Sequence, residues 1–382
     1  MGSITTDVLV IGAGSIGASV AFNLSQAGLR TVVVDQFDGP AQGSTGLCFA
    51  SVRGQWADDL NIAISWNSIQ TYQSFLLEYG FDVGYVPSGY LFIVPESAWP
   101  AHLDAVERQR ALGVPVEVLD VESATKITPF VVDGVAGATW GSADGVVDPH
   151  SVTSAYLAMA QASRAEVMFR HHVRSIDQAG DGWLVEAGSD EITAGVVINA
   201  AGGWAGDVAA LAGLEVPVAH SRRNIYAGAV GGYDRPLPMT IDLGSGVYMR
   251  SEGERLLFGG PPRPNVVGYS TDLDWPWLEE VILLGLKRFP WLADLPLDRD
   301  SSWAGTYEIT PDHQGILGSY PETPNWINAC GFSGHGFMQS PEIGRLVAEE
   351  VVTGRITSLD VTPLRIDRFS AMAQRTPVGM VF

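Results

Sequence analysis

Apolar and polar positions form distinct blocks along the first 35 residues. The apolar run at residues 8–11 ends at a glycine-rich segment, and apolar positions at helical spacing follow at 18–24. Gly28 is a predicted C-cap for this helix, and a second apolar run at 32–34 is followed by Asp35. This pattern predicts a strand, a tight turn, a helix and a second strand.

Two later segments repeat the change from a buried strand to a glycine turn. Residues 196–199 predict a strand that stops at a glycine turn before a short helix. Residues 326–329 predict another strand, followed by a glycine-rich loop and an amphipathic helix. For that helix the sequence predicts Ser340 as the N-cap, Pro341 as the first helical residue and Gly354 as the end.

Three other segments combine strand-forming residues with turn residues. They cover residues 85–95, 216–230 and 247–260, and they predict an antiparallel sheet in a second domain. No repeat, low-complexity stretch or long linker divides the sequence into two self-contained halves. The second domain is therefore expected to be inserted into the first in two pieces.

The glycines of the first turn fit the chemistry of dinucleotide binding. Gly12 permits a tight turn, Gly14 lets the backbone approach a pyrophosphate, and Gly17 lets the helix lie close to the strands. Asp35 follows Gly17 by 18 residues, close to the spacing of about 20 for an acid that binds the ribose. An acid there favours FAD or NAD over NADP, and the alternative is a glycine-rich turn of another α/β protein.

Composition narrows the class of protein. The 382 residues, 46% of them hydrophobic, suffice for about two domains. No apolar run approaches the ~18 residues of a membrane span, and no signal peptide is recognisable, which predicts a cytoplasmic protein. The net charge of −21 disfavours nucleic acid and anionic membranes as partners. Two cysteines are too few for a disulfide framework, and no metal-ligand spacing is present.

In this order, the motifs resemble the FAD-dependent D-amino acid oxidase, glycine oxidase and sarcosine oxidase superfamily, and most closely its sarcosine oxidase β-subunit and proline dehydrogenase branch. The resemblance is carried by residues 12–17, 43–46, 200–202, 303–312 and 331–338.

The resemblance implies an α/β (α+β) fold of the p-hydroxybenzoate-hydroxylase type. It implies a Rossmann-like FAD-binding domain with an interleaved antiparallel-sheet substrate domain. The expected FAD domain comprises residues 1–84, 146–216 and 306–360. The expected substrate domain comprises 85–145 and 217–305, and residues 361–382 form a C-terminal tail.

The resemblance also implies the chemistry. The expected substrate is an amine or amino acid, sarcosine-like or proline-like, oxidised at its C–N bond by hydride transfer to flavin N5, and the imine product hydrolyses. Two alternatives stay open: a FAD-dependent dehydrogenase of a 2-hydroxy acid, and the catalytic subunit of a hetero-oligomeric amine dehydrogenase. Both a homo-oligomer and a hetero-oligomer are compatible with the resemblance.

The family motifs assign a set of residues to FAD. They are Gly12, Gly14, Ser15, Ile16, Gly17, Asp35, Gln36, Gly43, Ser44, Thr45, Val173, Ala201, Gly202, Trp204, Gly305, Gly334, His335, Gly336, Phe337 and Met338. The N-terminus of the last helix is expected to stabilise the negative charge of reduced flavin.

Four residues are candidates for contact with substrate or flavin. Arg53 matches an arginine that clamps a substrate carboxylate, with a surface ion pair as the alternative. Tyr248 and Tyr307 match aromatic residues of the substrate cavity, with a plain core role as the alternative. His335 matches a histidine near the flavin ring, and it is equally compatible with a structural role.

Departures from the family motifs also carry information. Leu47 and Gly305 stand where some relatives attach flavin covalently, which predicts non-covalent FAD, although Cys48 lies one residue away. Met338 stands where monomeric sarcosine oxidases place a carboxylate-binding lysine. Leu257 stands where a lysine promotes reaction with oxygen, so a dehydrogenase and an oxidase are both compatible with the sequence.

Overall fold

The first predicted strand lies inside a sheet that is buried on both faces. In the computed structural model, which describes residues 2–229, 236–264 and 266–372, this strand pairs in parallel with both of its neighbours. Successive side chains of a strand point to opposite faces. Val8 and Val10 accordingly join one apolar cluster, and Leu9 and Ile11 join another.

This first sheet runs in the order β17-β18-β11-β1-β2-β8, with β10 and β9 added antiparallel beside β11. Its strands are β1 (Ser3–Ile11), β2 (Thr31–Val34), β8 (Glu166–Met168), β9 (Val173–Ala179), β10 (Gly182–Ala187), β11 (Asp190–Asn199), β17 (Ile316–Tyr320) and β18 (Thr323–Cys330). The strands predicted at 196–199 and 326–329 are thus confirmed as parts of β11 and β18. The pairs from β18 to β8 are parallel, and β17 is antiparallel to β18.

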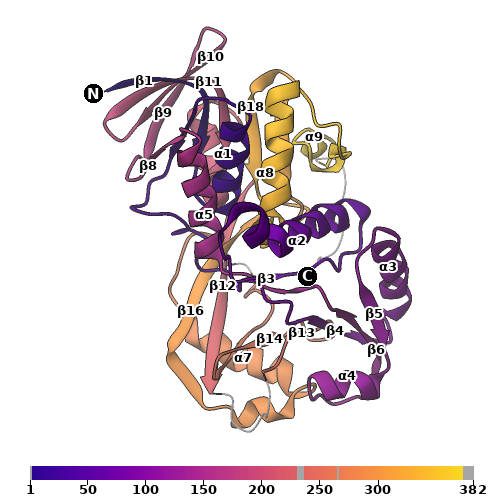
Figure 1. Ribbon diagram of the computed structural model, residues 1–382. Helices are drawn as coiled ribbons and strands as arrows, with labels where there is room; N and C mark the ends of the chain where they lie inside the picture. The colour runs from indigo at the N-terminus through magenta and orange to yellow at the C-terminus, as the bar shows by residue number, and fades with distance from the viewer. Residues whose placement is uncertain (1, 230–235, 265, 373–382) are drawn as a thin grey trace.

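A second sheet, below the first in Figure 1, runs in the order β16-β12-β15-β14-β13-β4-β6-β5. Its strands are β4 (Tyr90–Pro95), β5 (Val116–Leu119), β6 (Val135–Gly141), β12 (Ala219–Ala229), β13 (Met239–Asp242), β14 (Tyr248–Glu252), β15 (Arg255–Gly259) and β16 (Leu297–Ile309). All three predicted strand segments contribute to it. Val230 and residues 373–382 of the predicted tail lie outside the described residues.

One detail of this sheet differs from the prediction. The sheet is mixed, because β13 pairs with β4 in parallel, Met239 opposite Tyr90. The two strands come from different inserted pieces of the chain, and no hairpin joins them. A hairpin would have imposed antiparallel pairing, so the prediction of a wholly antiparallel sheet is wrong at this one pair.

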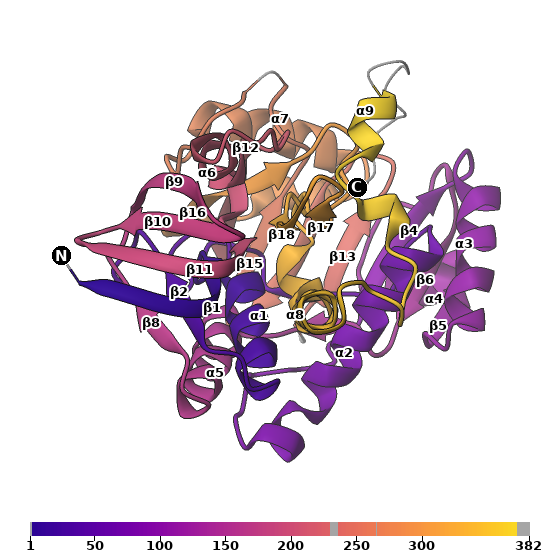
Figure 2. The same ribbon diagram turned by 90° about the horizontal axis from the view of Figure 1, so that it is seen from above.

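Helices cover both sheets. They are α1 (Ser15–Gln26), α2 (Asp59–Tyr79), α3 (Trp99–Ala111), α4 (Val121–Ile127), α5 (Pro149–Ala162), α6 (Ala205–Leu211), α7 (Trp275–Leu286), α8 (Gly336–Thr353) and α9 (Arg368–Met372), with short 3₁₀ turns η1 (Gly202–Trp204), η2 (Pro290–Asp294) and η3 (Thr362–Leu364). Helix α8 lies between α1 and α2 (Figure 2). A small ladder of β3 (Ser51–Val52) and β7 (Gly145–Val146) completes the described elements.

Helix α8 begins one turn earlier than the sequence predicts. It starts at Gly336, and Pro341 lies inside it. Proline has no N–H for the carbonyl four residues back, which here belongs to Phe337. The hydroxyl of Tyr72 in α2 donates to that carbonyl at 2.8 Å instead, so a side chain from another helix allows α8 to extend past the proline. The predicted helix end at Gly354 is confirmed.

Replacement of Tyr72 with phenylalanine tests this account of α8. The ring is buried, and loss of the hydroxyl leaves the Phe337 carbonyl without its donor. We expect the free energy of unfolding in urea to fall by about 1–3 kcal/mol, the usual cost of a buried unpaired polar group. Tyr269→Phe is the control, because Tyr269 is 48% exposed, and it should change stability by under ~0.5 kcal/mol. Equal effects of the two substitutions would contradict the account.

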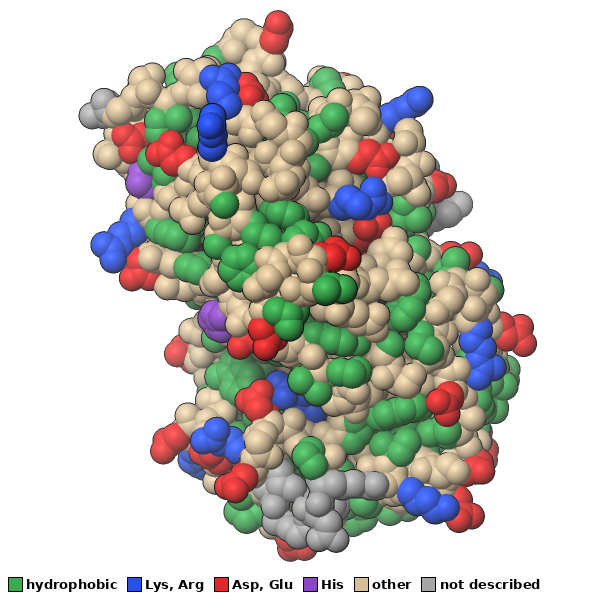
Figure 3. Space-filling model, viewed as in Figure 1, with side chains coloured by type: hydrophobic (Ala, Val, Ile, Leu, Met, Phe, Trp, Pro, Cys, Tyr) green, Lys and Arg blue, Asp and Glu red, His purple; other side chains and the backbone are tan. Residues whose placement is uncertain are grey.

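Charged side chains are dispersed over the face seen in Figure 3, where Lys and Arg stand singly or in small groups among acidic residues. Among the described residues, no helix has the length and apolar character needed to cross a membrane.

Candidate functional site

A cavity of about 490 Å³ opens where the carboxyl ends of the parallel strands meet the second sheet. Its wall includes Gly12 after β1, Asp35 after β2, Val173 after β8 and Ala201 after β11. Open α/β sheets bind ligands at this edge. The volume falls in the range of about 300–1,000 Å³ that is usual for ligand sites.

The turn after β1 requires glycine at two positions. Gly12 has φ +112°, and a Cβ there would lie 2.3 Å from the carbonyl oxygen of Ala200. A Cβ on Gly17 would lie 1.9 Å from the carbonyl oxygen of Gly12. The first glycine therefore lets β1 and β11 end side by side, and Gly17 lets α1 begin directly against the turn.

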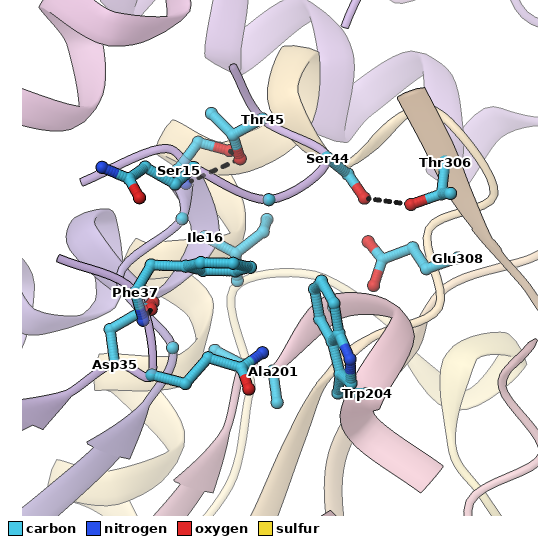
Figure 4. Close-up of a pocket in the computed structure, with 18 of the residues that line it drawn as sticks. Ser15, Ile16, Asp35, Phe37, Ser44, Thr45, Ala201, Trp204, Thr306 and Glu308 are labelled. Atoms are coloured by element: carbon cyan, nitrogen blue, oxygen red, sulfur yellow. Dashed lines mark hydrogen bonds between the residues drawn. The ribbon is translucent and has the colours of Figure 1, made fainter. Parts of the chain in front are cut away.

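The N-terminus of α1 faces the cavity and suits an anion. Its N-cap is Gly14, which makes no side-chain cap, and its first turn contains no acid. Gly14, Ser15 and Ile16 line the cavity. The Ser15 amide donates to Thr45 Oγ1 at 3.2 Å, which fixes the 43–45 loop over the helix end (Figure 4). Amides and the positive end of a helix together bind phosphate groups.

Asp35 is held in place by the backbone around it. Its carboxylate accepts the Ala13 amide at 2.6 Å and the Phe37 amide at 2.9 Å. Burial raises the pKa of Asp35 above its usual value, and the two amides oppose that shift. Because a carboxylate accepts about four hydrogen bonds, lone pairs remain for a ribose hydroxyl.

Most of the residues that the sequence assigns to FAD line this one cavity. They are Gly12, Gly14, Ser15, Ile16, Asp35, Gln36, Gly43, Ser44, Thr45, Val173, Ala201, Gly202, Trp204, Gly305, Gly334, Gly336 and Phe337. Three lie behind the wall. Gly17 packs on the first turn, His335 stacks edge-on against Trp56 with ring centroids 4.3 Å apart, and Met338 is buried in an apolar cluster.

One end of the cavity is aromatic and carries a cation. Tyr248 and Tyr307 line it, and Phe49 packs edge-on against Tyr248. Burial raises the pKa of both tyrosines, so their hydroxyls are neutral. The cation is Arg223, whose guanidinium carbon lies 4.4 Å from the centre of the Tyr307 ring.

Arg53 does not belong to the cavity wall. It is buried, its Nη1 donates to the Gln55 carbonyl, and its guanidinium lies 3.8 Å over the Trp56 ring. It follows the two-residue strand β3, and the segment before it, 47–52, departs from the family motif. The Arg53 side chain thus contacts residues of its own loop, Gln55 and Trp56. The arginine that lines the aromatic end of the cavity is Arg223.

The sequence interpretation missed Arg223 and Glu308. The register places Arg223 of β12 directly opposite Gly305 of β16, and its guanidinium lies against the Tyr307 ring. The available signal was a pair of arginines inside a predicted strand of a chain with only 22 basic residues. Glu308 lies within the family motif at residues 303–312, which implies no role for it, and it lines the cavity.

The positions relevant to covalent attachment also lie at the cavity. Gly305 packs against Leu47, so that a Cβ on Gly305 would lie 2.8 Å from the Leu47 carbonyl oxygen. Cys48 lines the cavity, and burial raises the pKa of its thiol to about 11. The thiol is therefore protonated at neutral pH and is a weak nucleophile.

Comparisons with known proteins agree with this geometry. The model of the FAD dependent oxidoreductase (DAO) family matches residues 7–350. FAD-dependent oxidoreductase domain-containing protein 1 of Xenopus laevis is 29% identical, over 95% of this chain and 82% of that protein. Mitochondrial sarcosine dehydrogenase of Mus musculus is 26% identical over 92% of this chain, which spans only 40% of that protein. The crystal structure of L-proline dehydrogenase from P. horikoshii superimposes with a TM-score of 0.87 at 28% identity, covering 97% of this chain and 99% of that one.

Proposed function

The chain belongs to the DAO family of FAD dependent oxidoreductases, and from this premise we propose that it oxidises the C–N bond of a secondary or N-methyl amino acid. Bound FAD supplies the hydride acceptor, flavin N5, in this chemistry. The substrate carbon beside nitrogen loses the hydride, and the resulting imine hydrolyses in water.

The residues of the cavity fit FAD. Two glycines that no other residue can replace without a clash hold the turn, and Asp35 offers lone pairs to the ribose. The N-terminus of α1, whose N-cap Gly14 has no side chain to cap it, offers amides to the diphosphate. We assign residues 1–84, 146–216 and 306–360 to the FAD domain, 85–145 and 217–305 to the substrate domain, and 361–382 to a C-terminal tail.

The single observation that carries the substrate assignment is the position of Arg223 at the aromatic end of the same cavity. A guanidinium fork can hold a carboxylate through two parallel hydrogen bonds. The rings of Tyr307 and Tyr248 exclude water and offer their faces to a cationic amine. Names of relatives, sarcosine dehydrogenase and L-proline dehydrogenase, point to the same substrate class.

A turnover screen tests this assignment. Sarcosine-like and proline-like amino acids are compared with matched 2-hydroxy acids, with oxygen and with an artificial dye as electron acceptors. We expect turnover with an amino acid and none with its hydroxy analogue. Turnover of the hydroxy acids alone would favour the alternative, a 2-hydroxy-acid dehydrogenase on the same fold. Activity that needs added partner chains would identify a subunit of a hetero-oligomer.

The FAD is expected to be non-covalent. The two positions that attach flavin in some relatives hold Leu47 and Gly305, which have no nucleophile, and the thiol of Cys48 is protonated. Acid precipitation of the flavin-loaded protein should release at least nine-tenths of the yellow colour into the supernatant. Colour that stays in the washed pellet would contradict this prediction, and Cys48→Ser would then show whether Cys48 is the attachment point.

A further inference from the structure

Glu308 lies where three glycine segments of the cavity converge. Its Oε2 accepts the Gly331 amide at 3.0 Å. A Cβ on Gly336, the first residue of α8, would lie 3.2 Å from its Oε1, and a Cβ on Gly202 would lie 3.7 Å from its Oε2. Figure 4 shows the carboxyl group directed into the pocket opposite Phe37, between Thr306 and Trp204.

Among the described residues, no cationic side chain is paired with Glu308, and the groups beside its carboxyl are backbone amides at the start of α8 and at Gly331. Burial raises its pKa to about 7, and the groups that oppose this shift are backbone amides. His220 lies directly opposite on β12, bonded through Nδ1 to Thr306, and burial lowers its pKa, so it is neutral. Cys330 and His335 are kept neutral by burial as well.

We propose that Glu308 contacts bound FAD as a neutral carboxylic acid whose O–H donates a hydrogen bond to an oxygen of the cofactor. Three features of FAD favour this form over the carboxylate. The diphosphate is an anion, and the bound cofactor removes water from the carboxyl group; both raise the pKa of an acid. The oxygens of FAD are largely acceptors, which a carboxylate cannot satisfy. The proposal rests on FAD binding and not on the identity of the substrate.

This protonation links FAD binding to the pH of the solution. At a pH at which Glu308 is ionised in the free protein and protonated in the complex, the protein takes up a proton from the buffer when FAD binds. Affinity for FAD therefore falls as pH rises above about 7, by up to about tenfold per pH unit for one proton. Below that pH the acid is protonated in both states, and Glu308 makes no contribution to the pH dependence.

Other titratable groups at the cavity need a control. Asp35, His171, His172 and Asp207 also line it, and they remain in Glu308→Gln. Glutamine keeps the size of the side chain, can still accept the Gly331 amide, and donates a hydrogen bond at every pH. The difference between wild type and E308Q consequently isolates the contribution of Glu308.

The test measures FAD binding to the flavin-free protein by fluorescence, and proton uptake by calorimetry in two buffers of different ionisation enthalpy. Between pH 6.5 and 8.5 the Kd of wild type should rise about 25-fold more than that of E308Q, and wild type should take up about one proton more near pH 8. Equal pH profiles, or weaker binding by E308Q at pH 8.5, would overturn the proposal.

A second variant keeps the proposal falsifiable if E308Q does not fold. In His171→Gln/His172→Gln the proton uptake at pH 8 should persist, because Glu308 is its source. If the uptake disappears in that variant, the histidines are responsible and the proposal fails. FAD that binds without any proton uptake in wild type would overturn it too, while leaving the proposed amine oxidation untouched.

Discussion

Replacing Arg223 with leucine is expected to lower kcat/KM for the amino-acid substrate by about 30- to 1,000-fold. Loss of a charged partner from a buried carboxylate costs about 2–4 kcal/mol, and each 1.4 kcal/mol is a factor of about ten. FAD content should be unchanged, because the glycine turn after β1 and Asp35, which we propose to hold FAD, lie on other segments. Steady-state kinetics with a dye acceptor measure the effect.

Two comparisons separate carboxylate binding from general damage. An amine that lacks the carboxylate should lose under about threefold in kcat/KM, since it never engages the guanidinium. Arg255→Leu, an exposed arginine on β15 paired with Asp298, should behave as wild type. Equal losses for the amino acid and the carboxylate-free amine would show that Arg223 maintains the cavity without binding the carboxylate.

Replacing Gly12 with alanine is expected to yield protein that binds FAD at least 100-fold more weakly. The backbone conformation at φ +112° is strained for any L side chain, at about 1–3 kcal/mol. The new Cβ also meets a backbone oxygen at 2.3 Å, so the turn that we propose to hold the diphosphate must move. FAD titration of the purified protein and its thermal unfolding midpoint report the two effects.

Gly28→Ala is the matched control for this substitution. Gly28 has φ +85°, yet a Cβ there meets nothing within 4 Å. It should lose about 1 kcal/mol of stability from backbone strain and retain its FAD. If Gly12→Ala also retains FAD with unchanged affinity, the turn after β1 is not the site of the diphosphate.

The βαβ unit could be predicted because its signals are local. Apolar runs, helical spacing and glycines lie within 35 residues, and β1, α1 and β2 confirm them. The start of α8 could not be predicted, because Pro341 is accommodated by Tyr72 from a helix distant in sequence. The parallel β13–β4 pair likewise depends on which inserted pieces meet, which no local pattern encodes.

The candidate site divides in the same way. Gly12, Gly14 and Asp35, which line the cavity, could be singled out by their spacing, because the roles proposed for them depend on the backbone beside them. Arg223 depends on strand register, since it acquires its place by lying opposite Gly305 across two strands far apart in sequence. Arg53 lies in a predicted loop and Arg223 in a predicted strand segment. Only the tertiary arrangement shows that Arg223, and not Arg53, lines the cavity.

The most direct measurement is an anaerobic titration of the FAD-loaded chain with sarcosine-like and proline-like amino acids and with their 2-hydroxy analogues. The account predicts that an amino acid bleaches the flavin absorbance and that its hydroxy analogue leaves it unchanged. Protein that cannot be loaded with FAD, or flavin that is bleached only by the hydroxy acids, would contradict it.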